Sequence, residues 1–232
     1  HDRTVSSRYL NYLERSMFTN LLGLDYTPAV TLSGNLGVWS YYTGVFSNAT
    51  GPDMEAAFTE LNAGWSFLGT AGVDLKRALR TDEAHLRLGV LHSDATKNAT
   101  NLNRYDDVFS ATLILTKGPT SLVTEATAGF GSSRGNGGAL NVQPAWYITD
   151  KLQLAMRYQL AVSDNEKGLS AQRRYERSAG LGTGALYRAA YAGLNYHVAA
   201  HRIKLLSGVE YATIAGEDAW TASVAVRVFW GP

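Results

Sequence analysis

The sequence predicts an all-β fold, an antiparallel β-barrel of which about eleven strands are present. The chain has 232 residues, and three observations point to this fold. Apolar and polar residues alternate with a period of two over segments of about ten residues or more, longer than the five or six of an ordinary soluble strand. The 23 glycines and 13 tyrosines, against only 5 prolines, are typical of long strands joined by tight turns. Very short turns also alternate with long polar loops.

The opening segment, residues 1–27, breaks this alternation because its apolar residues recur at helical spacing. These apolar residues are Tyr9, Leu10, Leu13, Met17 and Leu21. Ser6 and Ser7 stand where N-caps would start a helix. Two interpretations follow: an ordinary amphipathic surface helix, or a partly helical segment folded into the barrel that presents its serines and arginines inward.

About eleven segments with strand-like alternation follow the opening segment. They span residues 29–36, 38–48, 71–79, 84–93, 106–116, 120–131, 139–148, 151–163, 185–198, 202–213 and 218–230. Gly34 to Gly37 marks the turn of the first hairpin. Residues 55–67 are predicted as either a short helix or an extra strand, and residues 94–105 and 164–183 as polar loops.

The orientation of the two sheet faces distinguishes two kinds of barrel. In the segment 151–163 the apolar residues share one face, whereas Gln153, Arg157 and Gln159 share the other. A lipocalin-like soluble barrel would turn the apolar face inward, and a membrane barrel would turn it outward. Aromatic residues near strand ends, placed like interfacial girdles, favour the membrane barrel. They are Tyr147, Tyr211, Trp220, Phe229 and Trp230.

Composition argues against several other classes. The net charge of +1 gives no indication of a nucleic-acid partner. The chain has no cysteine, which removes disulfides and thiolate metal sites. The five histidines lack metal-ligand spacing and no Gly-x-Ser-x-Gly motif occurs, so we expect no enzyme activity, no metal and no cofactor. No apolar run approaches the ~20 residues of a membrane helix.

Three stretches carry a resemblance to a known family. They are Arg3-x-x-Ser6-Ser7 followed by Tyr9 and Glu14-Arg15-Ser16, the stretch from Gly34 to Asn48, and the pair 206–211 and 222–229. Together they resemble the phosphate-selective porin O and P family. The resemblance implies a barrel of about sixteen transmembrane strands in the bacterial outer membrane, usually trimeric, with a loop that narrows the pore.

The same resemblance implies a constriction loop at residues 1–27 and transmembrane strands over residues 28–232. With about eleven strands after the loop, some five strands of the family's barrel would precede it. We therefore expect the N-terminal part of the barrel to be absent from this chain, which begins at His1. Bare sheet edges are untenable in lipid, so the missing strands would have to come from elsewhere.

In the family, a basic residue, two serines and an arginine of this loop help to line the central anion site. By motif these positions correspond to Arg3, Ser6, Ser7 and Arg15. Arg3 stands where a lysine is usual, which keeps the charge but changes its donor geometry. The family's further basic residues in preceding strands have no counterpart here, which leaves phosphate selectivity open against a general anion preference.

With apolar residues outward, the lumen face would carry more basic than acidic residues, which predicts an anion-attracting lumen. The basic residues are Lys76, Arg87, Arg157, Lys204 and Arg227, with Arg188 if its strand is bulged near Gly193; the acidic ones are Asp74, Glu125 and Glu210. We predict a porin for passive diffusion of small anions, with phosphate or polyphosphate as candidates. Its expected partners are outer-membrane lipid and either a homotrimer or other outer-membrane subunits. The alternatives are a general porin, a structural or assembly-partner barrel, and a soluble barrel that binds an apolar ligand.

Overall fold

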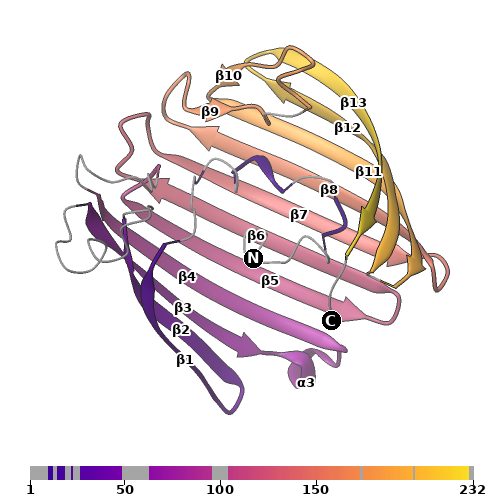
Figure 1. Cartoon of the computed structure of the whole chain (residues 1–232), viewed down its shortest axis with the longest axis horizontal. Helices are drawn as coiled ribbons and strands as arrows, with labels where there is room; N and C mark the ends of the chain where they lie inside the picture. The colour runs from indigo at the N-terminus through magenta and orange to yellow at the C-terminus, as the bar shows by residue number, and fades with distance from the viewer. Residues whose placement is uncertain are drawn as a thin grey trace.

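The computed structural model of the chain describes residues 10–12, 15–18, 22, 27–48, 63–95, 104–172, 175–200 and 202–229. Within them, eleven strands form one antiparallel sheet in which nearly every strand pairs with its neighbours in the chain (Figure 1). The strands are β1 (Ala29–Leu36), β2 (Trp39–Ser47), β3 (Gly64–Asp74), β4 (Glu83–Ala95), β5 (Asp107–Lys117), β6 (Thr120–Phe130), β7 (Gly137–Tyr147), β8 (Leu152–Ser163), β11 (Leu186–Ala199), β12 (Ile203–Ile214) and β13 (Glu217–Val228). The all-β prediction and the predicted strand number are confirmed.

The sheet is curved and open, with β1 and β13 as its two edges (Figure 1). Each edge strand pairs with one neighbour in the described part of the chain, β1 with β2 and β13 with β12. Closure into a barrel and insertion into a membrane therefore stay predictions.

The two faces of the sheet differ in polarity, as the alternation predicts. Along β11 exposed and buried residues alternate without interruption from Leu186 to Val198. The exposed residues include Leu194, at 44% exposure, whereas its neighbour Asn195 is fully buried. In β8 the face that carries Met156 is outward and the face that carries Arg157 is buried. The apolar face is thus the convex outer face of the sheet, and the polar face is the concave one, buried where β8 and β11 run.

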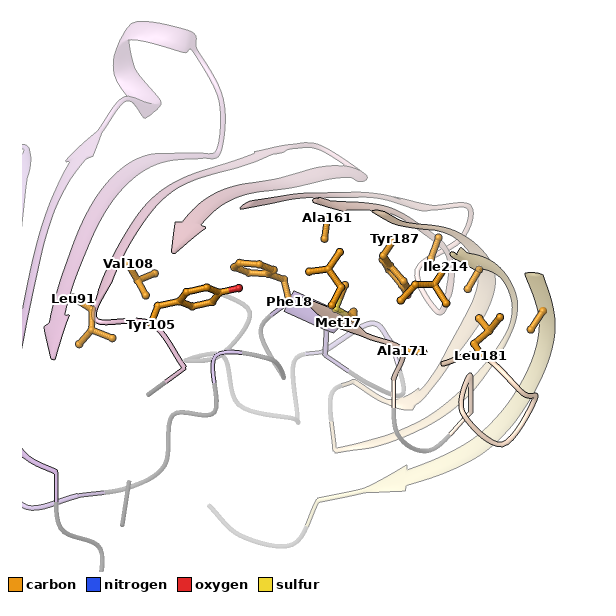
Figure 2. Packing of buried hydrophobic residues seen from close by; sticks show 14 residues of the cluster. Met17, Phe18, Leu91, Tyr105, Val108, Ala161, Ala171, Leu181, Tyr187 and Ile214 are labelled. Carbon is orange, nitrogen blue, oxygen red and sulfur yellow. The ribbon is translucent and has the colours of Figure 1, made fainter. Parts of the chain in front are cut away.

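An apolar cluster covers part of the concave face. Met17 and Phe18, whose backbone is helical, pack there between Tyr105 on one side and Tyr187 on the other (Figure 2). Leu169 and other residues of the long loop 164–183 complete the cluster. This inward packing explains why the polar face of β8 and β11 is buried instead of open to water.

The predicted strand 71–79 is wrong at both ends, since β3 begins seven residues before the predicted start. Strand β3 ends at Asp74, and residues Lys76–Leu79 form the short helix α3. The carboxylate of Asp74 accepts a hydrogen bond from the backbone N–H of Lys76 at 2.9 Å, and Arg80 ends the helix with a left-handed φ of 53°. The N-cap of α3 is Leu75, without a side-chain cap, so a turn closed by Asp74 and the left-handed Arg80 overrides the alternation here.

Two regions that the sequence left open are partly resolved. Strand β3 begins at Gly64, so the last residues of the ambiguous segment 55–67 form a strand, while residues 55–62 lie outside the described residues. The loop 164–183 contains a small separate hairpin, β9 (Leu169–Ser170) paired with β10 (Thr183–Gly184). Among the described residues, no helix is both long enough and apolar enough to cross a membrane.

Candidate functional site on the concave face

The described residues 10–12 and 15–18, called here the N-terminal segment, lie against the concave face of the C-terminal strands. The backbone carbonyl of Leu10 accepts hydrogen bonds from Lys204 Nζ at 2.6 Å and from Arg227 at 3.0 Å. Arg227 also donates to the carbonyl of Tyr12 at 3.1 Å. Two residues predicted to line the pore therefore bind the predicted constriction loop, through its main chain.

The register of the sheet brings these two cations together. Lys204 of β12 is directly opposite Arg227 of β13, with both side chains on the concave face. Like charges in this position repel each other and need an acceptor between them. The carbonyl of Leu10 supplies one. Arg15 of the N-terminal segment is also close enough to Arg227 for their charges to repel, so three basic groups gather at this part of the face.

Arg157 is paired instead of facing open space. Its guanidinium donates to the carboxylate of Glu210 at 2.9 Å, and the two side chains are only 3% and 9% exposed. The same guanidinium lies over the ring of Tyr12, 4.7 Å from its centroid, and 5.9 Å from the ring centroid of Tyr191. Arg157 thus contacts both the strand β12, through Glu210, and the N-terminal segment, through Tyr12.

Arg87 is the predicted basic residue that the structure leaves exposed on the concave face of a strand. It is in the middle of β4, opposite Gly72 of β3 and Thr112 of β5. Thr112 is in turn opposite Glu125 of β6. This part of the face is away from the three basic groups near β13, so the predicted basic residues form separate sites instead of one.

Two further predicted positions differ from expectation. Lys76 belongs to α3 instead of a strand face, and its half-exposed ammonium lies 3.5 Å from the carboxylate of Asp74. Arg188 is on the outer face, because the register of β11 runs unbroken through Gly193 on both sides and shifts only between His197 and Ala199. The predictions for Arg3, Ser6 and Ser7 fall outside the described residues.

Neutral amide side chains also hold the N-terminal segment, and the sequence reasoning missed them. The side-chain amide of Asn195 donates to the backbone carbonyl of Asn11 at 3.0 Å, and the side-chain Oε1 of Gln159 accepts the backbone N–H of Met17 at 2.8 Å. From the opposite side, Gln172 in the loop 164–183 donates to the carbonyl of Arg15 at 3.1 Å. These side chains carry no charge, so they were not among the predicted pore-lining residues, although the alternation in β8 indicates its polar face.

Glu176 anchors the loop 164–183 over the sheet. Its buried carboxylate accepts hydrogen bonds from the hydroxyl of Tyr187 and from the N–H of Gln172, the latter at 2.6 Å. Burial raises the pKa of this carboxyl, and the two hydrogen bonds oppose that rise. Because Gln172 also bonds Arg15, this carboxylate fixes the residue that closes over the N-terminal segment.

The contacts described above hold the N-terminal segment against the sheet. Among the described residues, no group of three or more histidine, aspartate or glutamate side chains could hold a metal ion. A scan against protein-family models finds no match, and a search of curated proteins finds no relative. The resemblance to the phosphate-selective porin O and P family therefore stays a prediction.

Proposed function

We propose that the chain forms part of a β-barrel porin of the bacterial outer membrane, through which small anions diffuse past the N-terminal segment. The observation that carries this proposal is the polarity of the sheet, with its apolar face outward. Large apolar residues are exposed along several strands, among them Val30, Leu32, Leu88, Phe109, Trp146, Leu194, Trp220, Val224 and Val226. A continuous apolar surface of this kind needs a membrane or a partner to cover it.

The preference for anions rests on the distribution of charge on the concave face. Arg15, Lys204 and Arg227 gather at one site, and Arg87 is exposed at another. The nearby carboxylate of Glu210 is already bonded to Arg157. Separate sites of moderate strength suit conduction, because an ion must both enter and leave. Phosphate selectivity, as opposed to a general anion preference, stays part of the proposal.

The open sheet restricts what can close the barrel. In an antiparallel sheet of eleven strands the first and last run in the same direction, so β1 and β13 cannot pair antiparallel with each other. A second copy in the same membrane orientation meets the same obstacle at each edge. Closure needs an odd number of additional strands, and five would give the sixteen strands that the resemblance implies. We propose that the additional strands are supplied either by another polypeptide of the outer membrane or by a further part of this protein.

Conductance in a planar bilayer under a chloride gradient tests the pore, with the complete native protein inserted and phosphate then titrated in. We expect a reversal potential of anionic sign and block of the chloride current by phosphate. Arg87→Gln should weaken the anion preference, whereas Arg77→Gln in α3 should leave it unchanged. Conductance without anion preference would support a general porin, and no conductance from inserted protein would support a structural barrel.

The outward apolar face can be tested separately with Leu194→Arg. Leu194 is in the middle of β11 and 44% exposed, so in water the substitution should change the unfolding free energy by less than ~0.5 kcal/mol. In a bilayer an arginine on the lipid face near the midplane costs about 2–4 kcal/mol. Asp150→Arg in an exposed turn is the control. Unfolding in lipid vesicles that is insensitive to Leu194→Arg would contradict the membrane proposal.

A further inference from the structure

Pro144 interrupts the hydrogen-bond ladder in the middle of the sheet. It is in β7, which has β6 on one side and β8 on the other. A proline has no N–H and is normally confined to edge strands or bulges. The pairing of β7 with β8 proceeds from Val142 opposite Tyr158 to Ala145 opposite Ala155, and the two pairs between them are missing.

The register identifies the carbonyl that loses its ladder donor. Directly after the end of β7, the N–H of Ile148 points to β8 and donates to the carbonyl of Leu152 at 2.8 Å. Four residues earlier the same register places residue 144 opposite Met156. An N–H at residue 144 would therefore donate to the carbonyl of Met156, and Pro144 cannot provide it.

The hydroxyl of Tyr12 occupies this place. It donates to the carbonyl of Met156 at 2.6 Å, although the two residues are 144 positions apart in the chain. The side chain of Tyr12 is only 2% exposed. Its ring packs edge-on against Tyr191 at 5.3 Å and under the guanidinium of Arg157 at 4.7 Å.

We propose that Tyr12 is a positioning residue, whose hydroxyl replaces the N–H that Pro144 lacks. This contact thereby sets where along the concave face of the sheet the N-terminal segment is bound. The other hydrogen bonds described above between this segment and the sheet use its backbone, which is the same at every residue. The Tyr12 hydroxyl is a side-chain contact, so it distinguishes one register of the segment from a slipped one.

This inference extends the proposed function by naming what holds the constriction in place, and it is tested without measuring conductance. The chain has no cysteine, so Ser16→Cys introduces a single thiol into the N-terminal segment. Ser16 is 4% exposed in the bound segment. The folded protein in detergent is then treated with a thiol reagent. The labelling rate of the introduced cysteine reports how often the N-terminal segment detaches from the concave face of the sheet.

In the Ser16→Cys protein, Tyr12→Phe should raise the labelling rate about tenfold, because the phenyl ring buries the Met156 carbonyl without offering it a donor. In the Pro144→Ala background the new N–H satisfies that carbonyl. There Tyr12→Phe should raise the labelling rate only about two- to threefold. The control is Tyr158→Phe, the same change on the outer face of β8, which should leave the labelling rate unchanged.

The proposal is overturned if Tyr12→Phe raises the labelling rate equally with Pro144 present and in the Pro144→Ala background. It is also overturned if Tyr12→Phe changes the labelling rate in neither. If Pro144→Ala does not fold, Pro144→Val takes its place, since valine has the same N–H and a higher strand propensity. The labelling result stands apart from the pore. A protein with the expected labelling pattern and no conductance would refute the proposed function alone.

Discussion

Replacing Glu210 with glutamine should destabilise the fold by about 3–5 kcal/mol, because it leaves the charge of Arg157 buried without its counterion. The two side chains are 2.9 Å apart and 3% and 9% exposed. Gln159, the other polar neighbour of this carboxylate, contacts it at 3.4 Å and cannot replace a charge. The effect should therefore exceed that of an ordinary surface substitution several-fold.

The magnitude follows from two opposing contributions. At 2.9 Å the attraction between Arg157 and Glu210 is about 6 kcal/mol with an effective dielectric constant of about 20. Desolvation costs several kcal/mol for each ion, so the intact pair contributes little net stability. Removing one partner loses the attraction while the desolvation cost of the other remains. Removing both charges, as in Arg157→Met with Glu210→Met, should change stability by no more than about 1 kcal/mol.

Chemical unfolding in urea measures these differences for Glu210→Gln, and for a cycle of Arg157→Met, Glu210→Met and the variant that carries both. Glu217→Gln is the matched control, because Glu217 begins β13 and is exposed. It should change the unfolding free energy by less than ~0.5 kcal/mol. If Glu210→Gln costs no more than the control, or if the two single effects simply add in the double variant, the argument from a buried ion pair is refuted.

Three further predictions concern single positions. Gly193→Ala should cost about 1–3 kcal/mol in urea unfolding, because a Cβ there would collide with the backbone carbonyl of Ser207; a neutral result would contradict the close strand approach. Burial raises the pKa of Glu176 above its unfolded value, so the contribution of this carboxyl to stability is greatest at low pH and falls as the pH rises above about 4.5. Stability–pH curves of the wild type and Glu176→Gln that run parallel would contradict this pH dependence. Tyr187→Phe is a second probe of the same carboxylate. Lys204→Met should increase hydrogen exchange in the N-terminal segment about tenfold by removing a charged donor, and unchanged exchange would show that this bond contributes nothing.

Local patterns were sufficient to predict the order and faces of the strands, although β3 begins seven residues before its predicted start. Strict alternation, as in β8 and β11, determines which side chains share a face, because successive residues in a strand point to opposite sides. Short turns between such segments place neighbouring strands antiparallel, which yields the observed order. The prediction failed at Lys76, where the side chain of Asp74 accepts the backbone N–H two residues later and the chain turns into a short helix.

The candidate site could not be predicted to the same degree, because its contacts join distant parts of the chain. Alternation places Arg157 and Glu210 on polar faces, but it does not indicate that they neutralise each other across 53 residues. Likewise Arg227 appears in the sequence as a free pore-lining charge, whereas its guanidinium binds the carbonyl of Leu10, 217 residues away. Partners of this kind depend on register across several strands.

The sequence by itself determined the all-β class, the approximate number of strands, and which side chains lie on the same face, because each of these depends on residues a few positions apart. The tertiary structure alone decided which polar groups stay exposed and which are used to bind the N-terminal segment. It also explains Pro144, which is anomalous in a central strand until the hydroxyl of Tyr12 is seen to fill the gap. A hydrogen bond of that kind has no local signature, since its donor and acceptor meet only after the sheet has curved around the segment.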